Sequence, residues 1–351
     1  MIKRIGKRTL ALENRPYLLG HAAAVGKKEG EGPLGERFDY VAKNDRMGQR
    51  SWELAESELQ KTAIRLALRK ATLPERSLDL ILAGDLLNQC IGSFLASMHA
   101  NVPYLGQYGA CSTMAQGLAL GGCLVESGAA DRLLAAASSH FCSAERQYRF
   151  PLAYGGQRTP TAQWTATAAG AAVLGSEPVP NGAEPCDVRV THVLFGKMVE
   201  MGVKDAANMG AAMAPAAAKT LCQFFNDTGA KPEDFDLILT GDLGFVGSRL
   251  FERLMQAQGC PIAGRHNDCG LMIYDRLRQD VHAGGSGCGC AASVLCSFIL
   301  PQIACQRLKN VLFMATGALM SPTSVQQGES IPGIAHLLHL SAFAGKEEEV
   351  R

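Results

Sequence analysis

The sequence predicts an α/β fold made of two duplicated halves. The segment DLILAGDL at residues 79–86 recurs 157 residues later as DLILTGDL at 236–243, with seven of eight positions identical. A second pair of segments follows these copies, because Gly-rich turns around Cys111 and Cys288 each precede an apolar run. Hydrophobic residues make up 47% of the chain and charged residues 19%, which is expected of a protein that buries large sheet and helix surfaces.

Each copy of the repeat predicts a buried parallel strand, since an apolar run that ends in a Gly-Asp pair is typical of one. The strands would end at Asp85 and Asp242, and open α/β sheets bind ligands at the carboxyl ends of their strands. Further strands are expected at 132–138 and 309–316, and a last pair at 170–174 and 333–338. Cys111 and Cys288 lie 177 residues apart, so the second half carries 20 extra residues, which must fall within 244–284.

The first half is expected to span residues 1–178 and the second half residues 179–351. Residues 1–60 differ in character from the repeated segments that follow them, and they are interpreted as an N-terminal extension. Within them, the charged, Gly-rich segment 27–37 predicts a surface loop, and an amphipathic helix should begin near Trp52 and end near Arg69. The C-terminal residues 346–351 predict a solvated tail.

Composition and charge argue against several classes of protein. The net charge of +1 gives no basic surface of the kind that binds nucleic acid. The first residues contain no apolar core of a secretory signal, and the longest apolar run, 291–304, is shorter than the roughly 20 residues of a spanning helix. Contact with a membrane is therefore expected only through a partner.

The twelve cysteines are expected to be thiols. One group of residues offers metal-binding side chains but lacks paired C-x-x-C spacing, so we predict no metal site. This group contains Cys260, His266, Cys269, Cys288 and Cys290.

Cys111 is the first candidate for chemistry. A cysteine that follows a Gly-rich turn at the start of a helix is favoured as a thiolate, because free backbone N–H groups and the helix dipole stabilise the anion. Cys288 occupies the matching place in the second half, and two such turns facing one cavity would attract an anionic ligand. The alternative is that Cys111 is a small buried residue in a crowded turn.

The layout resembles the thiolase and ketoacyl synthase superfamily over nearly the whole chain, with Cys111 in GACSTMAQGLAL matching its nucleophile. This resemblance implies a thiolase-like five-layer αβαβα fold. The similar condensing enzymes have a histidine in a motif like PHQAN and an asparagine in GNTSAAS, where this chain has Asp242 and Cys288. Thiolases use a Gly-His-Pro segment, which does not occur here; His266 and His282 are the alternative bases.

These replacements predict a protein without catalytic residues, in which Cys111 marks a vestigial nucleophile position. Decarboxylative condensation needs donors that stabilise a developing oxyanion, and an ionised Asp242 would repel it. Such a carboxylate acts only as an acceptor, a base or a cation ligand.

Longer segments are similar to a narrower family, stage V sporulation protein AD of endospore-forming bacteria. They include FDYVAKNDRMGQRSWELAE, YGACSTM, RTPTAQWTATAAGAAVLG and GGSGCGCAASV. The resemblance implies a protein that binds dipicolinate (pyridine-2,6-dicarboxylate), alone or with calcium, and supports its uptake into the developing spore. It also implies membrane partners encoded in the same operon, a position at the forespore inner membrane through these partners, and no cofactor. The superfamily commonly dimerises, so a homodimer is expected.

We expect the ligand site at the junction of the halves, where Cys111, Gly287 and Cys288 would meet the carboxylates of dipicolinate. Asp85 and Asp242 would engage calcium. Further candidates are Arg158 for charge pairing, Trp164 as a flat wall, and His266. Arg158 could equally tie a loop, and Trp164 could be core.

Three function classes stay open. They are a binding component of a transport machine, an acyl-transferring enzyme that uses Cys111, and a structural adaptor with a vestigial pocket.

Overall fold

The two halves of the chain form five-stranded arrays with the same strand order. This computed structural model describes residues 1–148, 157–178 and 187–343. The order is β3-β9-β7-β5-β6 in the first half and β10-β15-β14-β11-β12 in the second. In both halves the first strand along the chain lies beside the fifth, so the duplication predicted from the repeated segment is confirmed. The first-half strands are β3 Tyr17–Val25, β5 Leu80–Gly84, β6 Tyr104–Gly106, β7 Arg132–Ser139 and β9 Ala168–Gly175. The second-half strands are β10 Asp187–Leu194, β11 Leu237–Thr240, β12 His266–Asp268, β14 Asn310–Ala318 and β15 Gly333–Phe343.

The two arrays join where β3 and β10 pair antiparallel at Tyr17 and Arg189. Three short strands pair with the two central strands outside this order, and one small pair lies apart from the sheet. Strand β2 Thr9–Leu12 pairs with β10 and with β1 Ile2–Ile5, and β4 Tyr40–Val41 pairs with β3; the separate pair is β8 Trp164–Thr165 with β13 Gly285–Ser286. The predicted division at residues 178 and 179 falls in the connection between β9 and β10.

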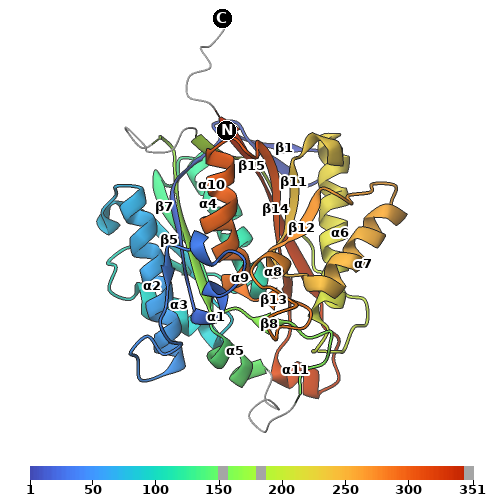
Figure 1. Ribbon diagram of the computed structural model, residues 1–351. Coiled ribbons are helices and arrows are strands. Elements are labelled where there is room, and N and C mark those ends of the chain that lie inside the picture. The colour runs from blue at the N-terminus through green and yellow to red at the C-terminus, as the bar shows by residue number, and fades with distance from the viewer. Residues whose placement is uncertain (149–156, 179–186, 344–351) are drawn as a thin grey trace, which may run out of the picture.

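Helices and sheet alternate in five layers, as Figure 1 shows, and this confirms the predicted αβαβα architecture. One outer layer covers the first-half strands, a central layer lies between the arrays, and the other outer layer covers the second-half strands. The outer layer on the first half contains α2 Trp52–Lys70 and α3 Ile91–Ser97. The central layer contains α4 Thr113–Glu126, α9 Cys288–Val294 and α10 Leu300–Ala304. The outer layer on the second half contains α6 Met209–Thr228 and α7 Gly244–Ala257. Four further helices lie in connections: α1 Lys27–Gly30, α5 Phe141–Tyr148, α8 Cys269–Met272 and α11 Pro322–Gln326.

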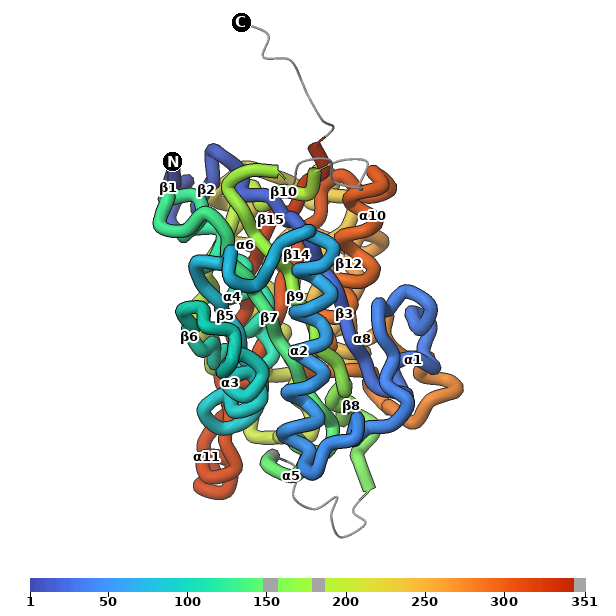
Figure 2. Tube along the Cα trace, turned by 90° about the vertical axis from the view of Figure 1, so that its left-hand side faces the viewer, coloured from blue at the N-terminus to red at the C-terminus, as the bar shows by residue number. Residues whose placement is uncertain are grey.

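Helix α2 is the element that the sequence predicted best. Ser51 caps its start by accepting a hydrogen bond from the Leu54 N–H, and its small and aliphatic face packs on β3 and β9 (Figure 2). The packing is close, because a Cβ atom at Gly20 of β3 would lie 2.5 Å from the carbonyl oxygen of Ala67. Only a glycine lets the helix approach the strand this closely.

The central layer brings the second half against the first-half sheet. A Cβ atom at Gly289 of α9 would lie 2.0 Å from the carbonyl oxygen of Ala168, so the start of α9 touches the backbone at the start of β9. A π-helical turn, Leu295–Ile299, then joins α9 to α10. This contact places the Gly287 turn within reach of the Cys111 turn, which starts the neighbouring helix α4.

The N-terminal segment contributes more to the core than the sequence indicated. Strand β3 lies within residues 1–60, in the middle of the sheet. The predicted surface loop at 27–37 begins with α1, whose Glu29 is buried. The Glu29 carboxylate accepts hydrogen bonds from the Tyr274 hydroxyl and, at 3.0 Å, from the Thr167 N–H. Glu29 therefore fastens this segment to the part of the second half that carries the extra 20 residues.

In the described part of the chain, no helix combines the length and the apolar character that crossing a bilayer requires.

Candidate functional site

A cavity of about 360 Å³ opens beside Cys111, between residues of the two halves. The first half contributes Tyr108, Cys111 and Glu145 to its lining, and the second half contributes Met209, Ser286 and Met320. This volume lies in the range of small-molecule sites. The position agrees with the expectation of a ligand site at the junction of the halves.

Cys111 lies in a tight turn, Ala110–Ser112, that leads into α4. Ala110 adopts a left-handed backbone conformation with φ of 49°, which is uncommon for a residue with a side chain and often occurs at functional sites. The turn is held by the Ser112 and Thr113 hydroxyl groups, which donate to the carbonyl oxygens of Gly109 and Ala110 at 2.6 Å each. Cys111 is only 5% exposed, yet it lines the cavity.

The thiol of Cys111 donates a hydrogen bond to the buried carboxylate of Asp242. Asp242 also accepts from the Thr316 hydroxyl at 2.7 Å and from the Gly287 N–H at 3.3 Å. Burial raises the pKa of Asp242 to about 7. Burial, and then the charge of Asp242, hold the pKa of Cys111 well above its ordinary value. Cys111 is therefore a neutral thiol at neutral pH, which is the opposite of an activated nucleophile.

Gly287 and Cys288 tie the second half to the Cys111 turn. The Cys288 thiol donates to the carbonyl oxygen of Ala110 at 2.9 Å, and its side chain is fully buried. Two backbone N–H groups of the α9 turn already have acceptors: Gly287 uses Asp242, and Gly289 uses the Ser139 hydroxyl at 3.1 Å. These two of the donors expected to meet an anion are thus engaged within the protein.

Asp85, although it matches Asp242 in the repeat, has a different environment. Its carboxylate accepts from the Leu87 N–H at 2.8 Å and from the Ser93 N–H and hydroxyl at 2.7 Å each. Burial raises its pKa, and Asp85 does not line the cavity. Its predicted role as a calcium ligand therefore has no geometric support.

Arg158 and Trp164 lie together, but outside the cavity lining. The Arg158 guanidinium pairs with the Asp280 carboxylate at 2.8 Å and lies 4.6 Å from the centre of the Trp164 ring. The Lys28 ammonium group lies 3.7 Å from the centre of the same ring. The Phe141 ring stacks on it, with 3.8 Å between the two ring centres. Arg158 thus ties a loop, which is the alternative that the sequence left open.

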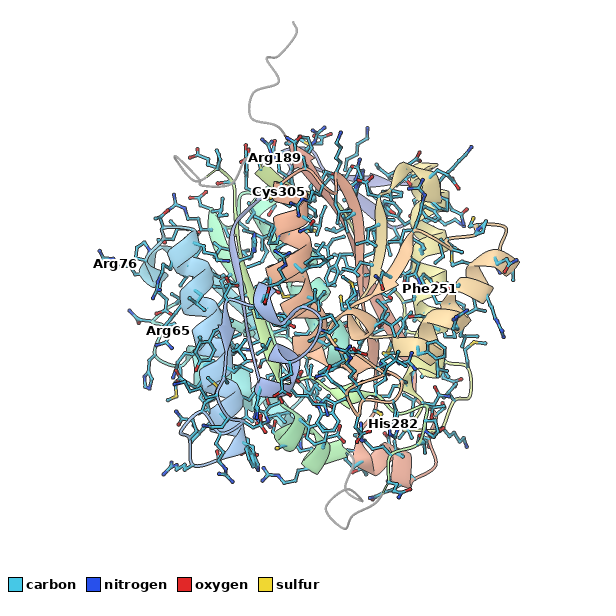
Figure 3. All side chains as sticks on the ribbon, viewed as in Figure 1. Arg65, Arg76, Arg189, Phe251, His282 and Cys305 are labelled. Carbon is cyan, nitrogen blue, oxygen red and sulfur yellow. The ribbon has the colours of Figure 1, made fainter. Side chains whose placement is uncertain are left out.

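The two candidate histidines are also outside the cavity lining. The His266 ring lies between the Thr240 hydroxyl at 2.9 Å and the Glu252 carboxylate at 3.1 Å, and it packs edge-on against Phe251. The His282 Nδ1 atom lies 2.7 Å from the Thr159 carbonyl oxygen, and Figure 3 shows this residue toward the lower edge of the view. The structure therefore gives neither histidine contact with Cys111.

Cys111 is the one predicted site residue in the described lining, and the lining residues that sequence reasoning missed include Tyr108, Glu145, Ser286 and Met320. Two of them carried a signal, because Tyr108 and Ser286 flank the turns of Cys111 and Cys288. Glu145 lies on α5, is buried, and accepts from the Thr165 hydroxyl at 2.9 Å. Within the described ranges, no group of three or more His, Cys, Asp and Glu side chains is arranged to hold a metal ion.

Gly287→Val should lower the free energy of unfolding by roughly 2–3 kcal/mol and weaken ligand binding. Gly287 has a φ of 107°, and a Cβ atom there would lie 2.6 Å from the Ser139 hydroxyl oxygen. Urea unfolding measures the loss. Gly128→Val is the matched control, because Gly128 also has a positive φ but nothing within 4 Å of an added Cβ. Equal losses in the two variants would show that crowding at Ser139 is not the cause.

Comparisons with known proteins agree with this fold. A model of the stage V sporulation protein AD family matches residues 6–341. Stage V sporulation protein AD of Bacillus subtilis (strain 168) is 44% identical over 335 residues, which cover 95% of this chain and 97% of that protein. Among solved structures, 3-oxoacyl-(acyl-carrier-protein) synthase III from Aquifex aeolicus VF5 is 14% identical with a TM-score of 0.55, over 93% of this chain and 99% of that one.

Cerulenin-bound OleA from Xanthomonas campestris is 16% identical with a TM-score of 0.58, over 93% of this chain and 96% of that one. At such low identity these two structures show the shared fold alone. The family model and the Bacillus subtilis relative go further, and they confirm the resemblance inferred from the conspicuous sequence segments. This chain belongs to the stage V sporulation protein AD family.

Proposed function

We propose that this protein binds dipicolinate in the cavity beside Cys111 and supports its uptake into the developing spore, together with membrane partners. Membership of the family places the chain among sporulation proteins. The observation that carries the proposal is a small-molecule cavity at the junction of the halves in which a neutral, Asp242-bonded thiol occupies the nucleophile position. Such a site favours binding over covalent chemistry.

The charges around the cavity favour dipicolinate that carries its calcium ion. The described lining residues include the carboxylate Glu145 but no lysine, arginine or histidine, and Asp242 lies behind Cys111. A bare dianion would meet these carboxylates unfavourably. The calcium chelate is neutral, and calcium prefers six to eight oxygen ligands, so it retains positions for oxygens such as those of Glu145 and Ser286.

Titration calorimetry with dipicolinate, with and without calcium, tests the proposal. We expect saturable binding of one ligand per chain, tighter when calcium is present. Pyridine-2-carboxylate, which lacks one carboxylate, is the matched control and should bind much more weakly. An absence of saturable heat under both conditions would overturn the assignment of dipicolinate to this protein.

The acyl-transferring alternative predicts an acyl-enzyme, whereas we expect none. Incubation with acetyl-CoA or malonyl thioesters should leave Cys111 unmodified, because its raised pKa keeps the thiol protonated at neutral pH. Mass spectrometry of the peptide that contains Cys111 checks this result. Stoichiometric acylation that turns over on addition of an acceptor would restore the enzyme hypothesis.

We also expect a homodimer. Strand β6 is an edge of the sheet, and its Leu105 is about half exposed, as are Phe94 of α3 and Met98 just after that helix. An edge strand with apolar neighbours is a ready surface for pairing with a second copy. Light scattering at micromolar concentration should give twice the chain mass of 37.3 kDa. Leu105→Asp should shift the protein toward the monomer, and a monomeric parent would contradict the expectation.

A further inference from the structure

A second groove, of about 600 Å³, lies on the second half along helix α6. Its floor is a single stripe of that helix, with residues spaced by three and four positions as on one helical face. The stripe consists of Pro215, Ala218, Lys219, Cys222, Gln223 and Asn226, and Thr220 of the same helix lines the groove beside it. One wall is formed by residues from Leu194, the last residue of β10, to Met201, and the other by Leu254 and Gln258 at the end of α7. This groove begins further along α6 than Met209, which lines the cavity beside Cys111.

The groove exposes large apolar side chains. Met198 is 68% exposed and Met201 is 60% exposed, and half-buried Leu254 lies on the opposite wall. Methionine side chains are flexible and polarizable, and they recur on surfaces that receive the apolar face of a helix. Exposed apolar groups gathered in one groove indicate a docking surface.

Three cationic side chains line the same groove. None of its described lining residues is acidic. Arg8, Lys197 and Lys219 form no ion pair with any carboxylate that the structure describes. Two nearby carboxylates are already hydrogen-bonded. Glu200 accepts from the Gly202 N–H and from Ser330. Asp227 accepts from the N–H groups of Lys7, Arg8 and Thr9 and from the side chain of Gln223, so two groove residues, Arg8 and Gln223, already bond to it. The groove is thus apolar at its walls and positively charged.

We propose that this groove binds an acidic amphipathic helix of a partner protein. The helix would lie along α6 with its apolar side against Met198, Met201 and Leu254. Its carboxylates would meet Lys197, Lys219 and Arg8. The stripe from Pro215 to Asn226 spans eleven helical steps, or about 16 Å, which accommodates about three turns of a bound helix. Charge complementarity selects an acidic partner over a basic one.

The probe is a synthetic 18-residue helical peptide with leucines on one face and glutamates on its flanks, carrying a fluorophore. The same peptide with lysine in place of each glutamate is its charge control. Fluorescence anisotropy should show saturable binding of the acidic peptide alone, weaker at 0.3 M than at 0.05 M salt because screening reduces charge pairing. Equal binding of the two peptides, or no saturable binding of the acidic one, overturns the proposal.

Variants locate the binding. Lys197→Glu with Lys219→Glu should weaken binding of the acidic peptide at least tenfold, and Met198→Ser with Met201→Ser at least fivefold. Lys204→Glu and Leu277→Ser are the matched controls, since both residues are exposed but outside the groove. Thermal unfolding confirms that each variant folds. Unchanged binding in both double variants overturns the proposal, as does groove-dependent binding of phosphatidylglycerol vesicles without binding of the peptide.

Discussion

Cys111→Asp should reduce the affinity for calcium-free dipicolinate by at least about a hundredfold, or roughly 3 kcal/mol. The new carboxylate would line the cavity and lie beside the buried Asp242 and near Glu145. Two carboxylates in contact share one proton, so the variant pair keeps a negative charge at pH 6. The parent pair is neutral there, because Cys111 is a thiol and Asp242, with a pKa of about 7, is mostly protonated. The added charge repels a dianion in a poorly solvated space. Titration calorimetry at pH 6 measures the loss.

Two controls separate charge from shape. Cys111→Ala removes the thiol without adding charge and should change the affinity by less than about fivefold, because the cavity walls persist. Cys111→Asn has nearly the shape of aspartate and stays neutral, so it should resemble the alanine variant. Calcium should restore much of the binding in Cys111→Asp, since the chelate is neutral. If the aspartate variant binds calcium-free dipicolinate as tightly as the parent, the ligand site lies elsewhere.

The repeat explains how much of this site could be predicted. Identical residues at 79–86 and 236–243 indicate equivalent strands, and the structure places Asp85 and Asp242 at the ends of β5 and β11 as expected. The side-chain partners differ because different helices approach the two strand ends. Ser93 of α3 donates hydrogen bonds to the Asp85 carboxylate, whereas Cys111 of the other half donates to the Asp242 carboxylate. Such a contact depends on the packing of the halves and leaves no local pattern in the sequence.

The candidates that failed to reach the cavity have a common physical reason. Arg158, Trp164 and His266 have chemically suitable side chains, but each is held by a partner distant in sequence or on a neighbouring element. Arg158 pairs with Asp280, in the part of the second half that carries the extra 20 residues. A motif near a turn predicts proximity, but it does not reveal which distant carboxylate pairs with the cation. Glu145 shows the converse, since its segment carries no motif and yet it lines the cavity.

Asp242→Asn should remove a penalty in stability that the parent carries at neutral pH. Burial raises the pKa of Asp242 from 3.8 to about 7 in the folded state. Between these values the folded state binds a proton that the unfolded state has lost, so the free energy of unfolding falls as pH rises and then levels off above pH 7. The variant lacks this dependence. Relative to the parent, its stability should therefore rise by on the order of 4 kcal/mol between pH 4 and pH 8.

The same carboxyl group should couple ligand binding to protons. A dianion beside Asp242 favours its protonated form, so the parent's affinity for calcium-free dipicolinate should fall as pH rises above 7, while that of Asp242→Asn stays level. Glu29→Gln is the matched control, since burial also raises the pKa of Glu29 to about 7. Asp242 is in contact with Cys111, which lines the cavity, whereas Glu29 bonds to Tyr274 and Thr167, which do not. It should alter the pH dependence of urea unfolding and leave that of calorimetric affinity unchanged. If Asp242→Asn and Glu29→Gln alter affinity alike, the effect comes from global stability, and Asp242 does not face the bound ligand.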